Sequence, residues 1–245
     1  MDLLEPGFKE LNRYKDILPY KYNSIKISTN SQYINASPIN IGDKKNLFIA
    51  TQGPIPQTIE DFWTIIWELN SKVIVMLCNL FENNKKKCEN YWETEMKQFK
   101  VKVKKEIKND IYYIREIQLI NLLNKEERNI TQIHYMNWPD HGVPDNNKLK
   151  IFSEINELVD KFNSNNMPII VHCSAGVGRT GTFIAMYLLE KEILKQIEDK
   201  CPIIRIIVFN IVRKLKEMRM YMVQTLEQYK LIYSFVEYLL EDKKN

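Results

Sequence analysis

The feature that most constrains the fold is a short apolar segment followed at once by a glycine-rich loop. Pro168-Ile-Ile-Val171 is rich in β-branched residues, which predicts a buried strand. Three of the chain's seven glycines, Gly176, Gly178 and Gly181, come shortly after it. Glycines between a strand and a helix let backbone N–H groups turn inward, and the helix N-terminus adds partial positive charge. The segment therefore predicts an anion-binding loop suited to phosphate.

A second apolar strand and several amphipathic helices indicate the fold class. Val73-Ile-Val-Met-Leu77 reads as a fully buried strand, and such strands need helices on both faces of their sheet. Thr58 and Thr225 each stand three residues before an acidic residue or a glutamine, Asp61 and Gln228, and so predict capping boxes. The predicted helices are 58–70, 181–197, 208–218 and one that begins at Thr225. Mixed strands and helices predict an α/β or α+β fold.

Composition favours one domain without membrane or nucleic-acid partners. The 245 residues contain no linker-like stretch or internal repeat, so we expect a single domain over 1–245. Lys and Arg exceed Asp and Glu by 35 − 31 = 4, which gives nucleic-acid binding no strong support. No apolar run approaches the roughly 20 residues that span a bilayer, so we expect no membrane insertion. Residues 100–104, Lys-Val-Lys-Val-Lys, predict a half-exposed strand whose lysines resist edge pairing.

The cysteines bear on compartment and on metal binding. Cys78, Cys88, Cys173 and Cys201 show no short repeated spacing, so reduced thiols in a cytosol-like compartment are expected. The absence of a CxxC pair predicts no metal site of that kind. No secretory or lipidation pattern occurs at either end of the chain.

The glycine-rich loop carries a thiol and a guanidinium that can meet one phosphate. In the run His172-Cys-Ser-Ala-Gly-Val-Gly-Arg-Thr180, Arg179 follows Cys173 by six residues. Inward N–H dipoles, the helix N-terminus and Arg179 each favour the thiolate, so Cys173 is the predicted nucleophile. The planar fork of Arg179 suits two phosphoryl oxygens. A nucleotide-binding P-loop needs GxxxxGK[ST], and the missing lysine disfavours an NTPase.

A second motif, Trp138-Pro-Asp-His-Gly-Val-Pro144, supplies one carboxyl in a hinge-like composition. Phosphoryl transfer from an ester is easier when an acid is at hand, because the departing oxygen leaves more easily once it is protonated. Asp140 is therefore the predicted general acid.

These motifs resemble the phosphotyrosine-specific protein tyrosine phosphatases. The family signature HC(x)5R[ST] is matched at 172–180, the run 138–144 is similar to the family's mobile WPD loop, and further matches cover nearly the whole chain. The resemblance implies one domain with a twisted mixed central β-sheet flanked by helices. Only eleven residues stand before Asn12, so the helical region that usually begins such domains is expected to be shortened.

The resemblance also implies how the substrate is recognised. Asn12-Arg-Tyr-Lys-Asp-Ile17 is similar to the family's tyrosine-recognition loop, in which Tyr14 would stack on the phenol and Asp16 would hydrogen-bond the peptide main chain. The aromatic wall makes the pocket deep, so that phosphotyrosine reaches Cys173 and phosphoserine does not. The implied substrate-binding residues are Tyr14, Asp16, Ile17, Lys87, Ser174, Ala175, Gly176, Val177, Gly178, Arg179, Gln224 and Gln228.

The remaining implied roles are catalytic. Gln224 would place the hydrolytic water, Glu82 would orient Arg179, and Asp140 would act as acid and then as base. Thr180 would assist release of the thiolate, and His172 would tune the cysteine by hydrogen bonding. The implied catalytic residues are thus Cys173, Arg179, Asp140, Gln224, Thr180, His172 and Glu82.

The predicted function is metal- and cofactor-independent hydrolysis of phosphotyrosine in proteins through a cysteinyl-phosphate. Its expected partners are tyrosine-phosphorylated proteins in signalling, and the expected state is a cytoplasmic monomer. Heavy use of Lys, Asn and Ile is typical of an AT-rich genome and would suit a viral or symbiont-derived enzyme in the cytosol of a host cell. Two alternatives stay open. One is a pseudophosphatase that binds and shields phosphotyrosine, although such proteins usually lack the Cys, Asp or Arg found here. The other is a dual-specificity or phosphoinositide phosphatase, which Tyr14 and Gln224 disfavour.

Overall fold

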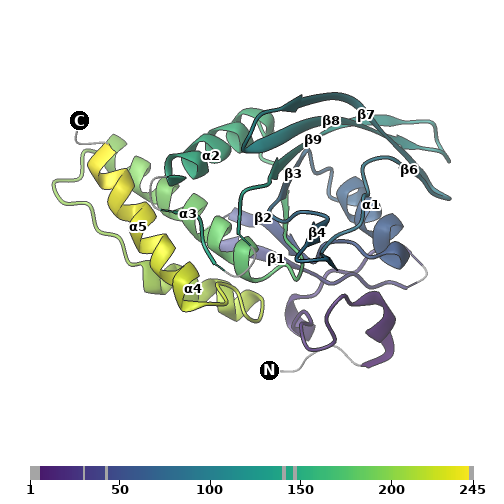
Figure 1. Cartoon of the computed structure of the whole chain (residues 1–245), viewed down its shortest axis with the longest axis horizontal. Helices are drawn as coiled ribbons and strands as arrows, with labels where there is room; N and C mark the ends of the chain where they lie inside the picture. The colour runs from purple at the N-terminus through teal and green to yellow at the C-terminus, as the bar shows by residue number, and fades with distance from the viewer. Residues whose placement is uncertain (1–5, 30, 42–43, 140–141, 146–147, 243–245) are drawn as a thin grey trace.

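A mixed β-sheet runs through the centre of the computed structural model, which describes residues 6–29, 31–41, 44–139, 142–145 and 148–242. In these residues the main sheet has eight strands in the order β1-β2-β10-β3-β9-β8-β7-β6, and β4 and β5 form a separate hairpin (Figure 1). The strands are β1 Ala36–Ile41, β2 Lys44–Thr51, β3 Val73–Met76, β4 Phe81–Glu82, β5 Lys85–Lys86, β6 Thr94–Glu95, β7 Phe99–Lys108, β8 Tyr112–Asn121, β9 Glu127–Tyr135 and β10 Ile169–His172.

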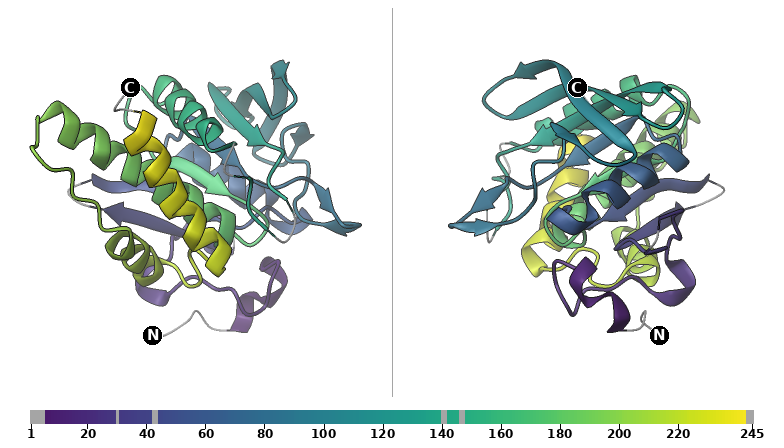
Figure 2. Two further views of the ribbon diagram at one scale, coloured as in Figure 1. Left: turned by 60° about the vertical axis from the view of Figure 1, so that its left-hand side comes forward. Right: turned by 90° about the vertical axis from the view of Figure 1, so that its right-hand side faces the viewer.

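Helices cover both faces of this sheet, as the sequence predicts. The α-helices are α1 Ile59–Glu68, α2 Lys150–Phe162, α3 Gly178–Glu198, α4 Val208–Met218 and α5 Leu226–Asp242. Short 3-10 turns occupy Pro6–Leu11, Lys21–Asn23 and Pro56–Thr58. Helices α2 to α5 lie on one side, and α1 lies on the other (Figure 2). The expected single domain with a mixed sheet flanked by helices is confirmed.

The centre of the sheet is parallel, and this arrangement places the anion loop. Strand β10 pairs in parallel with β2 on one side and with β3 on the other, and β3 pairs in parallel with β9. All four residues of β10 are buried, as are all four of β3. Because the carboxyl ends of parallel strands meet at one edge of a sheet, the segments that follow them gather there. Cys173 follows β10 directly and therefore lies in the middle of this edge.

The two predicted capping boxes have different outcomes. At the start of α5, Thr225 Oγ1 accepts a hydrogen bond from Gln228 N at 3.2 Å, and Gln228 Oε1 accepts one from Thr225 N at 3.3 Å. That box is confirmed. The predicted box of Thr58 with Asp61 is wrong, because Thr58 Oγ1 accepts from Ile55 N at 3.1 Å instead. The 3-10 turn before α1 turns this hydroxyl back toward the preceding residues.

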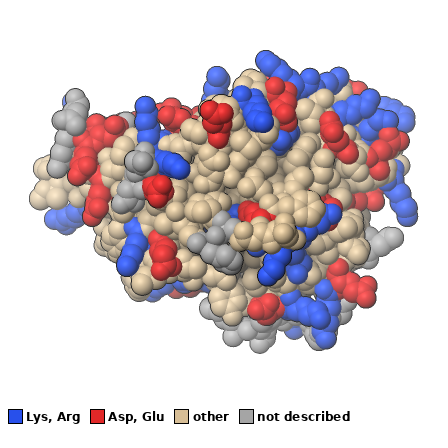
Figure 3. All heavy atoms as spheres, viewed as in Figure 1, with Lys and Arg blue, Asp and Glu red and all other residues tan. Residues whose placement is uncertain are grey.

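The outer strands carry much of the exposed charge. In β7 the side chains alternate between buried and exposed from Phe99 to Lys102, and the rest of the strand is largely exposed. Figure 3 shows Lys and Arg side chains gathered over β7 and β8 at the upper right, with acidic side chains among them. The predicted half-exposed strand at 100–104 is confirmed. None of the helices in the described ranges is long and apolar enough to cross a membrane.

Candidate active site

A pocket of about 400 Å³ opens over the loop that follows β10. It brings together residues from four parts of the chain that are far apart in sequence: the N-terminal segment, the β4–β5 hairpin, the 138–144 run and the segment before α5. The residues that line it are Tyr14, Asp16, Ile17, Glu82, Lys87, Pro139, Gly142, Cys173, Ser174, Ala175, Gly178, Arg179, Gln224, Thr225 and Gln228.

The floor of the pocket is the glycine-rich loop. Cys173 is 5% exposed, and the N–H of Gly176 donates to its Sγ at 3.3 Å. Gly176 has a φ of +72°, and a Cβ there would lie 2.1 Å from the carbonyl oxygen of Thr51 on the neighbouring strand. Only glycine fits that conformation and that space. The loop therefore curls tightly enough to turn a backbone donor toward the thiol.

Arg179 is held on the pocket wall by a carboxylate from the β4–β5 hairpin. Its Nη1 and Nη2 donate to the two oxygens of Glu82 at 2.6 and 2.8 Å, and Nη1 also donates to Leu77 O at 3.1 Å. Burial disfavours the charge of Arg179, but the hydrogen bonds to Glu82 and the attraction of Cys173, Glu82 and Cys78 together outweigh it, so the pKa of Arg179 is raised. Lys87 Nζ lies 4.0 Å from the same carboxylate. Glu82 thus fixes the plane of the guanidinium.

The N-terminal segment forms the opposite wall. Tyr14 Oη and Ser174 Oγ share a hydrogen bond of 3.0 Å, and Ser174 Oγ donates to Lys87 O at 2.9 Å. Arg13 secures the segment through donations to the carbonyl oxygens of Gly53 at 3.1 Å and Pro54 at 2.6 Å. Hydrogen bonds therefore connect the wall, the hairpin and the anion loop.

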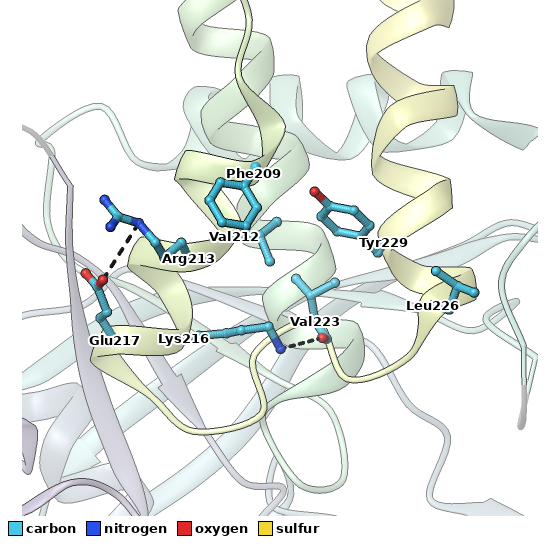
Figure 4. Close-up of a pocket in the computed structure, with 8 residues that line it drawn as sticks. All are labelled: Phe209, Val212, Arg213, Lys216, Glu217, Val223, Leu226 and Tyr229. Atoms are coloured by element: carbon cyan, nitrogen blue, oxygen red, sulfur yellow. Dashed lines mark hydrogen bonds and ion pairs between the residues drawn. The ribbon is translucent and has the colours of Figure 1, made fainter. Parts of the chain in front are cut away.

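The position of Gln224 is determined by the backbone contacts of its neighbour Val223. The N–H of Val223 donates to Val177 O at 3.3 Å, and Val223 O accepts a hydrogen bond from Lys216 Nζ at 3.0 Å (Figure 4). Val223 has a φ of +57°, an unfavourable conformation for a β-branched residue that these contacts must maintain. Gly181 in α3 allows the approach, because a Cβ there would lie 2.6 Å from Val223 N. Gln224 is held beside the anion loop as a result.

A larger apolar hollow of about 530 Å³ lies between α4 and α5, behind this segment (Figure 4). Phe209, Val212 and Tyr229 face one another across it, and Val223 and Leu226 close one end. It contains neither the thiol nor Arg179, so we place the candidate active site in the smaller pocket.

His172 supports the loop from below through a buried hydrogen-bond chain. Its Nδ1 lies 3.0 Å from Cys173 O and its Nε2 lies 2.7 Å from Tyr91 Oη. A carbonyl only accepts, so Nδ1 carries the proton and Nε2 accepts from Tyr91. Gln132 Nε2 donates to Tyr91 Oη at 2.7 Å, and Arg115 Nη1 donates to Gln132 Oε1 at 2.7 Å. The contact of His172 is with the backbone of Cys173, which fixes the loop at its first residue.

Burial of two histidines predicts a steep pH dependence of stability. Burial lowers the pKa of His172 from 6.5 to about 4 and, with repulsion by Arg115, lowers that of His134 from 6.5 to about 3. Between pH 6.5 and 4 the unfolded chain therefore binds more protons than the folded one, so the free energy of unfolding falls as the pH falls. Each histidine contributes a slope of up to about 1.4 kcal/mol per pH unit.

Urea denaturation at several pH values between 7 and 5 measures this slope, with His134→Gln as the matched variant. We expect the variant to show a clearly smaller slope than the parent chain. A free energy of unfolding that stays constant over that range contradicts the prediction.

Four described residues that were expected at the site are not among those that line the pocket, and a fifth expected residue is not described. Gly176 and Val177 belong to the loop, but the side chain of Val177 is fully buried beneath it. His172 and Thr180 are also fully buried, and within the described residues Thr180 Oγ1 has no hydrogen-bond partner. Asp140 lies outside the described residues, between Pro139 and Gly142 of the pocket lining.

No group of three or more His, Cys, Asp or Glu side chains in the described ranges is arranged to hold a metal ion. All four cysteines are free thiols, as expected from their spacing.

Sequence reasoning missed two supporting residues. Thr225 lines the pocket as well as capping α5. Arg219 is fully buried against the loop, and its place between Met218 and Met220, a charge among apolar residues, was the available signal.

The fold and the site together define a protein with a buried thiol in an anion-binding loop at the centre of a mixed sheet. The family model described as protein-tyrosine phosphatase matches residues 8–238. Human receptor-type tyrosine-protein phosphatase alpha is 38% identical over 244 residues, which are 95% of this chain and 29% of that protein. The chain spans less than a third of the length of this curated relative.

Solved structures show the same similarity. The catalytic domain of human protein tyrosine phosphatase non-receptor type 18 superposes with a TM-score of 0.87 and 33% identity, over 96% of this chain and 86% of that one. A structure of PTPN18 in complex with HER2-pY1196 phosphopeptides gives a TM-score of 0.87 and 34% identity, over 96% and 83%. The chain belongs to the protein-tyrosine phosphatase family.

Proposed function

We propose that this chain hydrolyses phosphotyrosine in proteins through a cysteinyl-phosphate intermediate. The observation that carries the proposal is the floor of the pocket, where Cys173 Sγ accepts the Gly176 N–H and Arg179 is fixed nearby by Glu82. A thiol, inward N–H donors and a guanidinium converging on one pocket suit a phosphoryl group.

In the first step Cys173 Sγ attacks phosphorus. The S–P bond forms as the bond from phosphorus to the tyrosyl oxygen breaks, and Asp140 gives its proton to that oxygen. Arg179 and the N–H groups of the loop bind the other three phosphoryl oxygens, where negative charge is spread in the transition state. The two-point hold of Glu82 on Arg179 keeps the guanidinium plane ready for this contact.

In the second step water cleaves the S–P bond. Gln224 positions the water, Asp140 accepts a proton from it, and the thiolate leaves with inorganic phosphate as the other product. Thr180, whose hydroxyl is buried without a partner among the described residues, assists the departing thiolate. His172 acts through the carbonyl group of Cys173.

The wall that carries Tyr14 supports phosphotyrosine as the substrate. The ring of Tyr14 stacks on the substrate phenol, Asp16 and Ile17 contact the peptide, and Lys87 and Gln228 complete the lining. The phosphopeptide complex of the related PTPN18 agrees with tyrosine-phosphorylated proteins as partners. These features disfavour a dual-specificity or phosphoinositide phosphatase.

We further propose that residues 1–245 form one catalytic domain, that it acts as a monomer without metal or cofactor, and that it works in signalling in the cytosol. The free state of all four thiols supports a reducing compartment.

Steady-state hydrolysis of a phosphotyrosine peptide in EDTA tests the proposal, with phosphothreonine and phosphoinositide substrates beside it. We expect turnover of phosphotyrosine alone, and a loss of about 10²- to 10⁴-fold in kcat for Asp140→Ala, the size of a general-acid contribution. A folded chain that binds the peptide and releases no phosphate would instead be a shielding module.

A further inference from the structure

A second arginine, Arg219, is buried behind the anion loop. It follows α4 directly as the C-cap residue, its side chain is fully buried, and it makes no ion pair within the described residues. Its hydrogen bonds go to neutral groups: Gly176 O at 2.8 Å, Ala175 O at 3.2 Å, Asn35 Oδ1 at 2.7 Å and Ser37 Oγ at 3.3 Å. Burying a guanidinium without a carboxylate partner costs folding free energy, so the position of Arg219 calls for a physical explanation.

The two bonds to the loop determine which way its peptide groups face. Arg219 binds the carbonyl oxygens of Ala175 and Gly176, and none of the described peptide bonds is cis. In a trans peptide the N–H points opposite to the C=O, so the N–H groups of Gly176 and Val177 are turned to the other side. That side is the pocket floor, where the Gly176 N–H meets Cys173 Sγ at 3.3 Å.

The same guanidinium ties the loop to the recognition wall. Asn35 accepts from Arg219 and donates through its Nδ2 to Ile17 O and Asn12 Oδ1, both at 2.7 Å. Ser37 lies in β1 at the edge of the sheet. Arg219 therefore joins the end of α4, strand β1, the recognition segment and the anion loop.

Arg219 also keeps a positive charge behind the loop at neutral pH. Burial lowers the pKa of Arg219 to about 10, and attraction to Tyr33 and Cys173 opposes the decrease. Among the described residues, the other ionisable groups around Cys173 include Arg179 with its partner Glu82, His172 below the loop, Cys78, and the pocket-lining Tyr14, Asp16 and Lys87.

We propose that Arg219 is a positioning residue that holds the loop carbonyls outward, so that the loop N–H groups and the charge of Arg219 together stabilise a tetrahedral dianion in the pocket. This inference rests on the phosphatase function proposed above, but the contact of Arg219 is with the loop and not with the substrate.

The test compares Arg219→Lys and Arg219→Met with the parent chain and with Arg128→Lys. Arg128 is a suitable control because its guanidinium also binds a carbonyl oxygen, Trp67 O, at 2.6 Å, away from the pocket. Tungstate, a tetrahedral dianion, is titrated by calorimetry, and the rate of alkylation of Cys173 by iodoacetamide is measured against pH. Melting temperatures identify the variants that fold.

For both Arg219 variants we expect tungstate affinity to fall about tenfold or more, the size of a lost charge-assisted hydrogen bond, and the alkylation curve to move to higher pH. In the hydrolysis assay kcat should fall more than KM rises, because the loop donors act most strongly on the transition state. Arg128→Lys should match the parent in every readout except melting temperature.

Asn35→Asp provides a second test if the Arg219 variants do not fold. It is nearly isosteric and places a carboxylate on Arg219 Nη2, which cancels the charge behind the loop while the guanidinium stays. It also removes the two hydrogen bonds that Asn35 Nδ2 donates to Ile17 and Asn12, so its melting temperature is compared with that of the parent chain. We expect weaker tungstate binding and the same shift of the alkylation curve.

Folded Arg219 variants, or a folded Asn35→Asp chain, with parental tungstate affinity and a parental alkylation curve would overturn the proposal. If instead the proposed phosphatase function is wrong, the parent chain will bind tungstate but release no phosphate from the peptide.

Discussion

Replacing Cys173 by serine is expected to abolish turnover of phosphotyrosine while phosphopeptide binding survives. The sulfur is the atom that would form the bond to phosphorus, and a serine hydroxyl in its place stays protonated at neutral pH and is a far weaker nucleophile than a thiolate. The donors of the loop and the fork of Arg179 remain in the variant. Loss of a catalytic nucleophile typically reduces kcat by roughly 10⁴- to 10⁶-fold.

Phosphate release and peptide binding are measured on the same preparations, with Cys201→Ser as the matched control. Cys201 is a free thiol like Cys173 but exposed, so its replacement should leave kcat, KM and peptide affinity at parental values. Turnover retained by the Cys173→Ser chain would exclude the cysteinyl-phosphate mechanism. A chain that loses peptide binding as well would indicate a collapsed loop, which the melting temperature would reveal.

Replacing Arg179 by lysine is the second change with a large expected effect, about 10³-fold in kcat/KM. The guanidinium donates to both oxygens of Glu82 and to Leu77 O, which leaves its remaining edge for phosphoryl oxygens. Lysine keeps the charge but is a single-point donor, so the bidentate contact with the phosphoryl group and the fixed orientation by Glu82 are both lost. Removal of one such transition-state donor costs about 10²- to 10³-fold, and two contacts are affected here.

Full kinetics of Arg179→Lys measure the effect, and Glu82→Gln separates its two parts. Glu82→Gln leaves the guanidinium in place with a weaker hold, so a smaller loss, mainly in kcat, is expected. Arg213→Lys, a change in an exposed pair with Glu217, is the control and should leave both constants unchanged. Parental kcat/KM in Arg179→Lys would mean that the planar fork has no part in catalysis.

Both predictions distinguish a chain that hydrolyses phosphotyrosine from one that only binds it. An enzyme loses activity in the Cys173 variant and retains affinity, whereas a module that only shields phosphotyrosine shows no activity to lose and depends on Arg179 for affinity alone.

The parts of this protein that the sequence alone determined are local. Cys173 and Arg179 lie in one loop, so their spacing implies that they can meet one anion, and the strand before the loop is recognisable from its β-branched residues. The box of Thr225 and Gln228 joins residues three positions apart and was correctly predicted. Such features depend on backbone geometry over a few residues, and neighbouring segments change them little.

Only the tertiary structure decided the contacts between segments that are distant in the sequence. Tyr91 meets His172 across 81 residues, and Arg219 meets Gly176 across 43. Thr58 is an exception at short range, because its hydroxyl bonds Ile55 in the turn before it and does not cap the helix after it. Burial removes water as the partner of each polar group, so each such group must find another wherever the packed chain places one. The sequence identifies the thiol and the arginine of the loop. The packing of β1, β10, α4 and the β4–β5 hairpin determines how these two side chains are positioned.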